Sequence, residues 1–335
     1  METLKQPKIV ELEEGKLYTL FLKVYSISTR QDRRGNPFIS LELGDISGRI
    51  TGFVFGVSEI PGAAAGKVLK VKANVEEHNG KLNLKLSQWR LATEEEAAAA
   101  APCLHRRSKE EPRIILNKIM EEYIEPLAEE FPVEHAILET IFQENVEALL
   151  ESGAASKLHH AYEGGLLEHI LSLCDSVSLI APKYHLDYGT MIALACLHDI
   201  GKIYELTNNS GVIEYTRMGA LSPHIISGIL LVQRTFDREF FNEMMPAKFS
   251  AVDVRNRLQA IIHGIASHHG RLEDGSPVRP STAEAIAFHF LDNLDSRMQM
   301  VAEEWEYAPA DQDITPERHY ALGVKLVRFI DDSQD

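Results

Sequence analysis

The sequence has few cysteines, few glycines and prolines, and no long hydrophobic run. Its 335 residues contain three cysteines, too few for a disulfide framework, which favours a reducing, cytoplasmic setting. No apolar run reaches the ~18 residues of a membrane-spanning helix, and the opening segment lacks the apolar centre of a secretory signal. We therefore expect no membrane partner. With 21 glycines and 14 prolines, the composition is neither collagen-like nor globally disordered.

The charge is divided unevenly along the chain. The net charge is −16, but residues 1–92 hold 14 Lys and Arg against 10 Asp and Glu, and residues 93–335 hold 20 against 40. Of the 14 histidines, only His78 lies in the first part. This length is typical of about two domains, and the asymmetry predicts that they do different work.

Residues 1–92 have the pattern of a small β-barrel. Between Lys16 and Trp89, five short segments alternate apolar and polar residues, which is typical of half-buried strands. Asn79-Gly80 between the last two segments is a strong hairpin signal. Five strands in ~75 residues favour an OB-fold, although the pattern alone fits an SH3-like barrel as well.

The pattern changes after the barrel. Residues 93–111 contain the alanine-rich segment TEEEAAAAAP followed by charged residues, and we interpret them as a linker. From residue 112 to about 330, apolar residues recur at helical spacing, which predicts an all-α domain with its candidate metal-site core at about 157–300. The predicted fold class is therefore a multidomain α and β protein.

The strongest chemical signal is LACLHDIGKIYEL, in which an apolar helical run ends at His198 and Asp199. Neighbouring helical residues point about 100° apart, so this pair fits a site that straddles two cations. Other candidate ligands fall on separate predicted helices, as in metal sites of helical scaffolds. They are His169, His224, His263, His268, His269, His289, Asp292 and Asp295. Taken singly, each histidine fits a buried, hydrogen-bonded residue equally well.

The order of these residues resembles the HD-domain metal-dependent phosphohydrolase superfamily, with His169, then His198-Asp199, then Asp292. Three further histidines resemble its two-metal branch: His224, His268 and His269. Together, HHAYEGGLLEH, LHDIGKIYEL, SHHG, GSPVRP and LDNLD resemble the YhaM-type 3′-to-5′ exoribonucleases, which join an N-terminal OB-fold domain to a C-terminal HD domain. The resemblance covers nearly the whole chain, except residues 93–102.

The resemblance implies two divalent metal ions that share Asp199. The first would be held by His169, His198, Asp199 and Asp292. The second would be held by Asp199, His224, His268 and His269. Lys202 would face the substrate phosphate and, with Asp199, carry catalysis. His160 and Arg279 match family motifs and are candidate substrate contacts.

The implied activity is metal-dependent hydrolysis of single-stranded RNA from its 3′ end, with single-stranded DNA as a second candidate substrate. Two cations ~3.5–4 Å apart lower the pKa of a shared water and neutralise phosphate oxygens, so no serine or cysteine nucleophile is required. Nitrogen and oxygen ligands favour Mn²⁺, Fe²⁺ or Co²⁺, and the resemblance points to Mn²⁺.

The barrel offers candidate contacts to a nucleic-acid strand. Aromatic residues on its middle strands are either stacking surfaces for bases or ordinary barrel core: Phe38, Phe53 and Phe55. The polar turn RQDRRGNP cannot be core and supplies cations for phosphates: Arg30, Arg33 and Arg34.

Two other functions stay open at this point. HD domains also hydrolyse small nucleotides, although a basic barrel favours a polymer. The other hypothesis is a protein that binds single-stranded DNA or RNA and has a secondary metal site. The sequence also leaves the oligomeric state open, with the helices at 112–151 as a candidate homo-oligomer interface.

Overall fold

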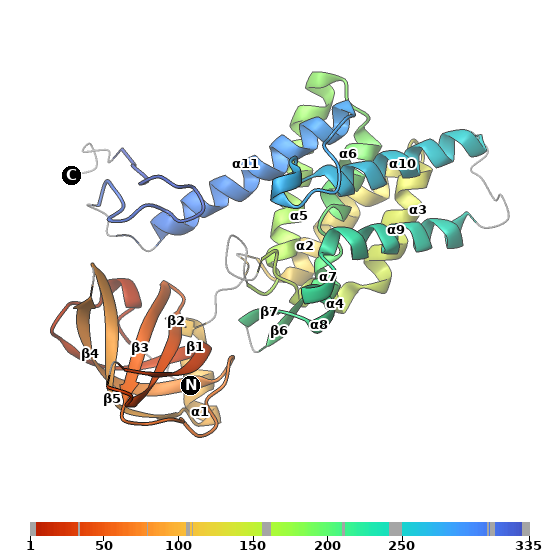
Figure 1. Cartoon of the computed structure of the whole chain (residues 1–335). Helices are drawn as coiled ribbons and strands as arrows, with labels where there is room; N and C mark the ends of the chain where they lie inside the picture. The colour runs from red at the N-terminus through yellow and green to blue at the C-terminus, as the bar shows by residue number, and fades with distance from the viewer. Residues whose placement is uncertain are drawn as a thin grey trace. The chain divides into compact units, whose positions relative to one another are not determined.

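The structure is a computed structural model that describes residues 5–32, 34–78, 80–104, 108, 110–155, 162–209, 212–240, 250–306, 308 and 312–329 (Figure 1). The chain divides into two compact units. The first comprises Met1–Arg106, Asn209–Val212 and Glu303–Asp335, and the second comprises Arg107–Asn208 and Ile213–Ala302.

The N-terminal part of the first unit is a closed barrel of five strands. They are β1 (Leu17–Gln31), β2 (Pro37–Asp45), β3 (Gly48–Phe55), β4 (Val68–His78) and β5 (Lys81–Leu91). The order around the barrel is β1-β2-β3-β5-β4; β1 pairs with both β2 and β4, and β3 pairs with β5 in parallel. The predicted OB-fold is confirmed by this closed barrel, and the SH3-like alternative is wrong.

The barrel follows from the period-2 pattern. Leu20, Leu22 and Val24 alternate along β1 and point into an apolar core, where each is at most 1% exposed. The predicted hairpin is present, since His78 pairs with Lys81 across the β4–β5 turn. Gly80 has φ +77, a conformation that favours glycine and that such turns require. Asn79 lies outside the described residues.

The structure differs from the expected linker over part of residues 93–111. Helix α1 (Glu94–Leu104) covers an outer face of the barrel, with Ala100 and Leu104 buried against Phe21 and Val68. A capping box begins the helix: the Glu96 amide donates to Thr93 Oγ1 at 3.2 Å, and the Thr93 amide donates to a Glu96 carboxylate oxygen at 3.0 Å. Ala97 and Ala100 pack in one apolar cluster with Phe21, whereas the linker interpretation rested on Pro102 and the charged residues that follow it.

The second unit is helical and has a large apolar core. Its α-helices are α2 (Pro112–Ile119), α3 (Pro132–Glu144), α4 (Val146–Glu151), α5 (Gly165–Tyr184), α6 (Tyr188–Leu197), α7 (Lys202–Glu205), α8 (Arg217–Leu221), α9 (His224–Glu239), α10 (Ala251–Ser267) and α11 (Ala283–Glu306). The chain also has a short hairpin of β6 (Leu206–Asn209) and β7 (Val212–Tyr215), which the all-α prediction did not include.

Two helices at the centre of this unit explain where the site forms. In α6, every residue from Gly189 to Leu197 is buried, so the helix runs through the core and ends at His198. Helix α5 is long and apolar enough to cross a membrane by length and composition alone. It packs against α6 through buried residues such as Leu173 and Cys174, and it carries the buried His169, as expected of a core helix.

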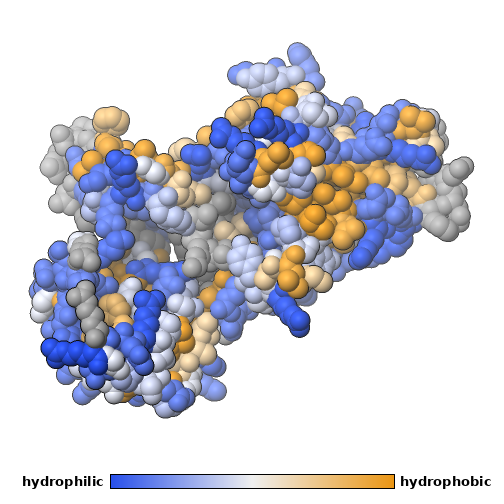
Figure 2. All heavy atoms as spheres, in the orientation of Figure 1, coloured by the Kyte–Doolittle hydropathy of each residue, from blue (hydrophilic) through white to orange (hydrophobic). Residues whose placement is uncertain are grey.

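Part of the helical surface is apolar. Figure 2 shows hydrophobic side chains gathered over α9 and α10. On α11, a row of side chains four residues apart is 45–66% exposed: Ile286, Phe290, Leu294 and Met298. The opposite side of α11 packs into the core through Phe288 and Leu291. This helix therefore has a buried side, an exposed apolar side and, as described below, a polar side.

Candidate metal centre

Five helices and one turn deliver the candidate ligands to a common point. His169 lies on α5, His198 and Asp199 follow α6, and Asp292 lies on α11. His224 begins α9, while His268 and His269 follow α10. The turn after Asp199 packs so closely against α9 that a Cβ on Gly201 would lie 2.0 Å from the His224 carbonyl oxygen. Only glycine admits this approach, which explains the glycine that follows the His-Asp pair.

The first donor cluster consists of His169, His198 and Asp292, each of which offers one ligand atom within 4.8 Å of the others. His169 Nε2 lies 3.2 Å from His198 Nε2 and 3.2 Å from Asp292 Oδ1. His169 and His198 are at most 1% exposed. Two imidazole nitrogens and a carboxylate oxygen at this spacing are a suitable donor set for a divalent cation.

The second donor cluster consists of His224, His268 and His269, whose ligand atoms also lie within 4.8 Å of one another. The rings of His268 and His269 are edge to face with centroids 4.2 Å apart. Three imidazoles gathered at one point are a second, nitrogen-rich donor set.

Asp199 lies between the two clusters and directs one oxygen to each. Its Oδ2 is 3.2 Å from His198 Nε2 and 4.0 Å from His169 Nε2. Its Oδ1 is 3.2 Å from His224 Nε2 and 3.7 Å from His268 Nε2. A single carboxylate can therefore contribute to both clusters, which is the arrangement required of a bridging ligand.

Each histidine of the clusters is fixed through its other ring nitrogen. In every case Nδ1 donates to a carboxylate or to a backbone carbonyl, so Nε2 points to the centre of the site and presents a lone pair there when the ring is neutral. The acceptors are Asp295 for His169 (2.8 Å), the Leu194 carbonyl for His198 (3.2 Å), Glu205 for His224 (2.9 Å), the Ile265 carbonyl for His268 (2.8 Å) and the Asp274 carbonyl for His269 (2.9 Å).

Three buried atoms of the site have no hydrogen-bond partner among the described residues. They are Asp199 Oδ1, His224 Nε2 and His268 Nε2. All three are acceptors in the tautomers that the Nδ1 hydrogen bonds favour, so they cannot satisfy one another. Buried polar atoms are rarely left unpaired. A divalent cation would satisfy them, and the donor set fits one.

The charges of the site suit metal binding. Burial raises the pKa of Asp199, but Lys202 and His198 outweigh this effect and hold that pKa well below its usual range. Burial, together with His198 and His269, holds the pKa of His268 well below its usual range. The carboxylate is therefore ionised and this imidazole neutral near pH 7, which are the states that bind metals.

His169 carries a proton in the metal-free chain. Burial lowers its pKa, but hydrogen bonds to Asp292 and Asp295 outweigh burial and raise it to about 9. A cation bound at the first cluster would have to displace this proton, since a coordinating imidazole must be neutral on the ligating nitrogen.

Lys202 lies beside the bridging carboxylate. Its Nζ is 2.5 Å from Asp199 Oδ2, and its side chain is 13% exposed. It also lines a pocket of about 310 Å³ that reaches donors of both clusters. The expected position of Lys202 next to a substrate phosphate remains a prediction, because its ammonium group is paired with Asp199 here.

The pocket contains side chains that sequence reasoning did not select. Besides Asp199, Lys202, His268, His269 and Asp292, these lining residues are Asp274, Asn293, Ser296 and Arg297. His289, which the sequence did offer as a candidate ligand, also lines the pocket. Glu205, which accepts from both the amide and the ring of His224, was also missed. Its signal is a carboxylate inside the apolar segment that follows the His-Asp pair.

The two remaining candidates are not brought into this pocket. Arg279 is exposed and is not among the residues that line it. His160 lies outside the described residues.

On the barrel, three phenylalanines form an outward-facing cluster. Phe38 on β2 pairs with Phe55 on β3, and the rings of Phe38, Phe53 and Phe55 lie with centroids 5.7–6.2 Å apart. Their neighbours Ile39 and Val54 point inward and are fully buried, whereas Phe55 is 54% exposed. The barrel-core alternative is therefore wrong for these aromatic residues.

Basic side chains accompany this phenylalanine cluster. Arg30 on β1 pairs with Phe38, and Lys85 on β5 pairs with Phe53. Arg34 lies exposed in the following turn, and Arg33 lies outside the described residues. The phenylalanine cluster thus has cations on both flanking strands, an arrangement that suits stacked bases and their phosphates.

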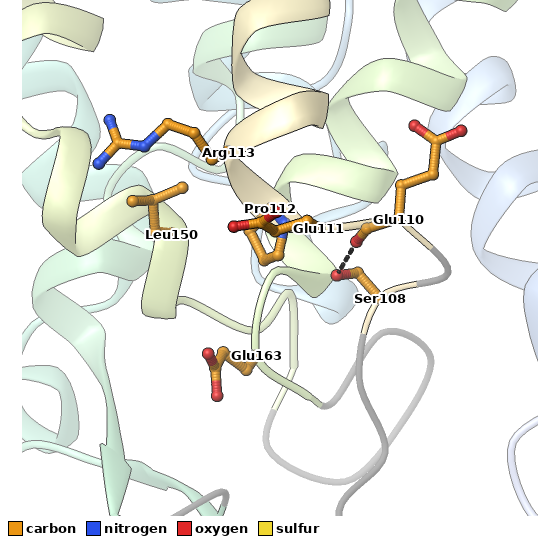
Figure 3. A pocket seen from close by; sticks show the side chains of 7 residues that line it. All are labelled: Ser108, Glu110, Glu111, Pro112, Arg113, Leu150 and Glu163. Carbon is orange, nitrogen blue, oxygen red and sulfur yellow. Dashed lines mark hydrogen bonds between the residues drawn. The ribbon is translucent and has the colours of Figure 1, made fainter.

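A second pocket of about 600 Å³ lies at the start of α2 (Figure 3). Its lining includes Glu110, Glu111 and Glu163, and Ser108 Oγ donates to the Glu110 carbonyl at 2.6 Å. None of its described residues belongs to either donor cluster. The pocket that reaches the two clusters is therefore the better candidate for chemistry.

Comparison with known proteins agrees with this site. Residues 166–297 match the HD domain family. The match spans every residue of the two donor clusters and Asp199. HD domains are metal-dependent phosphohydrolases, and the donor set is consistent with hydrolase activity. Among solved structures, a domain of replication protein A from Methanococcus maripaludis is similar, with 21% identity over 25% of this chain and 92% of that chain, and a TM-score of 0.23.

Proposed function

We propose that this chain is a metal-dependent phosphodiesterase that degrades single-stranded RNA from its 3′ end. The observation that carries the proposal is the pair of donor clusters joined by Asp199 within an HD domain. Two divalent cations held there would activate water and neutralise phosphate oxygens. The imidazole-rich donor set favours Mn²⁺ over Mg²⁺ as the native ion.

The barrel supports a polymer as the substrate. Its exposed phenylalanine cluster and flanking Arg30 and Lys85 are the features with which OB-folds hold single strands. The barrel region is mildly basic, whereas residues 93–335 carry twice as many acidic as basic residues. A strand would therefore be attracted to the barrel and repelled by most of the remaining surface. The 3′-to-5′ direction rests on the resemblance to YhaM-type enzymes.

The test is digestion of single-stranded RNA labelled at its 5′ end, with Mn²⁺ or with EDTA, by the wild type and by Asp199→Asn. We expect a ladder that shortens from the 3′ end only with Mn²⁺ and only in the wild type. Asp237→Asn, an exposed aspartate on α9, is the matched control and should behave as the wild type.

Other outcomes separate the alternatives. RNA that is bound but uncut in Mn²⁺ would contradict the enzyme and favour a binding protein. RNA that is neither bound nor cut would contradict the polymer substrate and direct attention to small nucleotides. Equal digestion of single-stranded DNA would broaden the substrate without changing the site.

A further inference from the structure

One wall of the metal-site pocket is formed by successive turns of α11. Asp292 belongs to the first donor cluster, and Asn293, Ser296 and Arg297 line the same pocket. Asn293 and Arg297 are four residues apart and therefore neighbours on the helix surface. The Arg297 Nε donates to Asn293 Oδ1 at 2.6 Å, which orients the guanidinium group.

Among the described residues, Arg297 hydrogen-bonds to Asn293 and has no carboxylate partner. Three other arginines of this unit do have one: Arg113, Arg238 and Arg257 each lie 2.6–3.1 Å from a glutamate. Arg297 lines one pocket with Asp199, Asp274 and Asp292, yet its guanidinium group pairs with none of these carboxylates. Its terminal nitrogens are instead available to an anion.

Lys202, a second cationic side chain that lines the pocket, is not available to bind an anion. Lys202 is held by Asp199 at 2.5 Å and is only 13% exposed. A guanidinium group also binds phosphate through two parallel hydrogen bonds, which an ammonium group cannot do. The chemistry of this wall therefore favours a phosphate as the ligand of Arg297.

The position of Arg297 indicates which phosphate it binds. Arg297 follows Asp292 by five residues, which places it ~7.5 Å further along the helix axis. A phosphate held at the donor clusters would lie beside Asp292, and this offset directs Arg297 towards the next part of the substrate. The ~7.5 Å offset between Asp292 and Arg297 along the helix suits a second phosphate in the same strand.

We propose that Arg297, oriented by Asn293, binds a phosphate adjacent to the one that is cleaved. The site then prefers substrates with at least two phosphates over single phosphodiesters. This inference rests on the proposed hydrolase function, because it assigns the substrate class of the same pocket.

The test compares three small RNA substrates with Mn²⁺: ApA, which has only the scissile phosphate, and pApA and ApAp, which add a phosphate at one end or the other. We expect the wild type to prefer one of the phosphorylated substrates. Arg297→Ala should lower kcat/KM for that substrate by ~10–100-fold, as expected for a lost charged hydrogen bond, and for ApA by less than ~2-fold. Arg297→Lys should recover only part of the loss.

Two further variants make the test specific. Asn293→Ala should raise KM for the preferred substrate with little change in kcat, because it frees the guanidinium group without removing it. Arg271→Ala removes an exposed arginine that does not line the pocket, and it should leave all three substrates unchanged. Thermal midpoints of the variants should match that of the wild type.

The outcomes that overturn the inference are distinct from failure of the hydrolase. A wild type that cleaves ApA, pApA and ApAp equally well would overturn it, and so would an equal loss on all three in Arg297→Ala. In both cases the hydrolase function would stand. A wild type that cleaves none of the three, and that also leaves longer RNA uncut, would overturn the proposed function and this inference with it.

Discussion

The barrel and the helical unit present their functional side chains in opposite ways. On the barrel, the phenylalanine cluster faces outward, and Phe55 is 54% exposed. In the helical unit, His169 and His198 are at most 1% exposed, and each is hydrogen-bonded through Nδ1. One region offers open apolar surface. The other offers buried acceptor atoms, such as Asp199 Oδ1, that have no hydrogen-bond partner among the described residues.

This difference follows from the chemistry that the proposed function assigns to each region. Bases stack on exposed rings whatever their sequence, so a binding face tolerates mobility and solvent. Metal donors must be held at fixed distances and in one protonation state, which requires burial and a second layer of hydrogen bonds. Changes in the two regions should therefore separate binding from hydrolysis.

The largest expected effect is the loss of hydrolysis in Asp199→Ala. Removing the carboxylate that serves both clusters should lower kcat by roughly 10³-fold or more, because it eliminates charge stabilisation at the reacting phosphate. The affinity for single-stranded RNA, measured in EDTA, should be unchanged, since the barrel is intact. An equal loss of RNA affinity would contradict the assignment of RNA binding to the barrel and of hydrolysis to the helical unit.

The opposite result, weaker RNA binding with unchanged hydrolysis, is expected when Phe38→Ala is combined with Phe55→Ala. Each lost stacking contact should weaken RNA binding by ~1–3 kcal/mol, or about 5–150-fold. Hydrolysis of ApA, which is too short to need the barrel, should not change. Leu82→Ala, at an apolar barrel residue that is 37% exposed, is the matched control for binding. Undiminished RNA affinity in the double variant would remove the phenylalanine cluster from the binding face.

A smaller effect is expected when the second layer of the site is changed. Glu205→Gln weakens the hydrogen bond that orients His224 and should lower the affinity for Mn²⁺ by ~10–100-fold. At Mn²⁺ concentrations ~100 times Kd, the wild type should gain about 2.7 kcal/mol of stability, and the variant should gain less. Calorimetry measures both. Glu129→Gln, at an exposed glutamate of the same unit, should match the wild type.

The smallest effect concerns the barrel alone. Thr93→Ala removes the N-cap of α1 and should destabilise the barrel by about 1 kcal/mol. The measurement is the urea midpoint for unfolding of the barrel unit, which should be lower than in the wild type. Thr93→Ser keeps the capping oxygen and should restore most of the loss. Mn²⁺ affinity should be the same in all three proteins; a change would show that α1 also supports the metal centre.

The barrel could be predicted from the sequence because its strands obey period 2 and its last hairpin contains Asn-Gly. The orientation of Phe38, Phe53 and Phe55 could not, because alternation shows that two residues share a face but not which face is inside. Helix α1 was missed because Pro102 and the charged residues after it suggested a linker, although the alanines and the capping box at Thr93 and Glu96 favour a helix.

The candidate ligands could be selected by residue type and order, since few other patterns place histidines and aspartates on successive helices. The structure brings His169, His198, Asp199, His224, His268, His269 and Asp292 together. Glu205 and Arg297 could not be found in the same way. Their positions depend on how α7 and α11 pack. The only signal for Glu205 is a carboxylate inside an apolar segment, and a lone arginine in a helical segment is common on any surface.

The hydrogen bonds at the Nδ1 atoms have an entropic consequence. The five imidazoles of the two clusters give up their rotational freedom when the helical unit folds, before any ion arrives. A cation that binds therefore orders few side chains, and the water that it releases makes a favourable contribution to the entropy of binding. The exposed rings of the barrel are the converse, because there the strand itself must be ordered at the moment it binds.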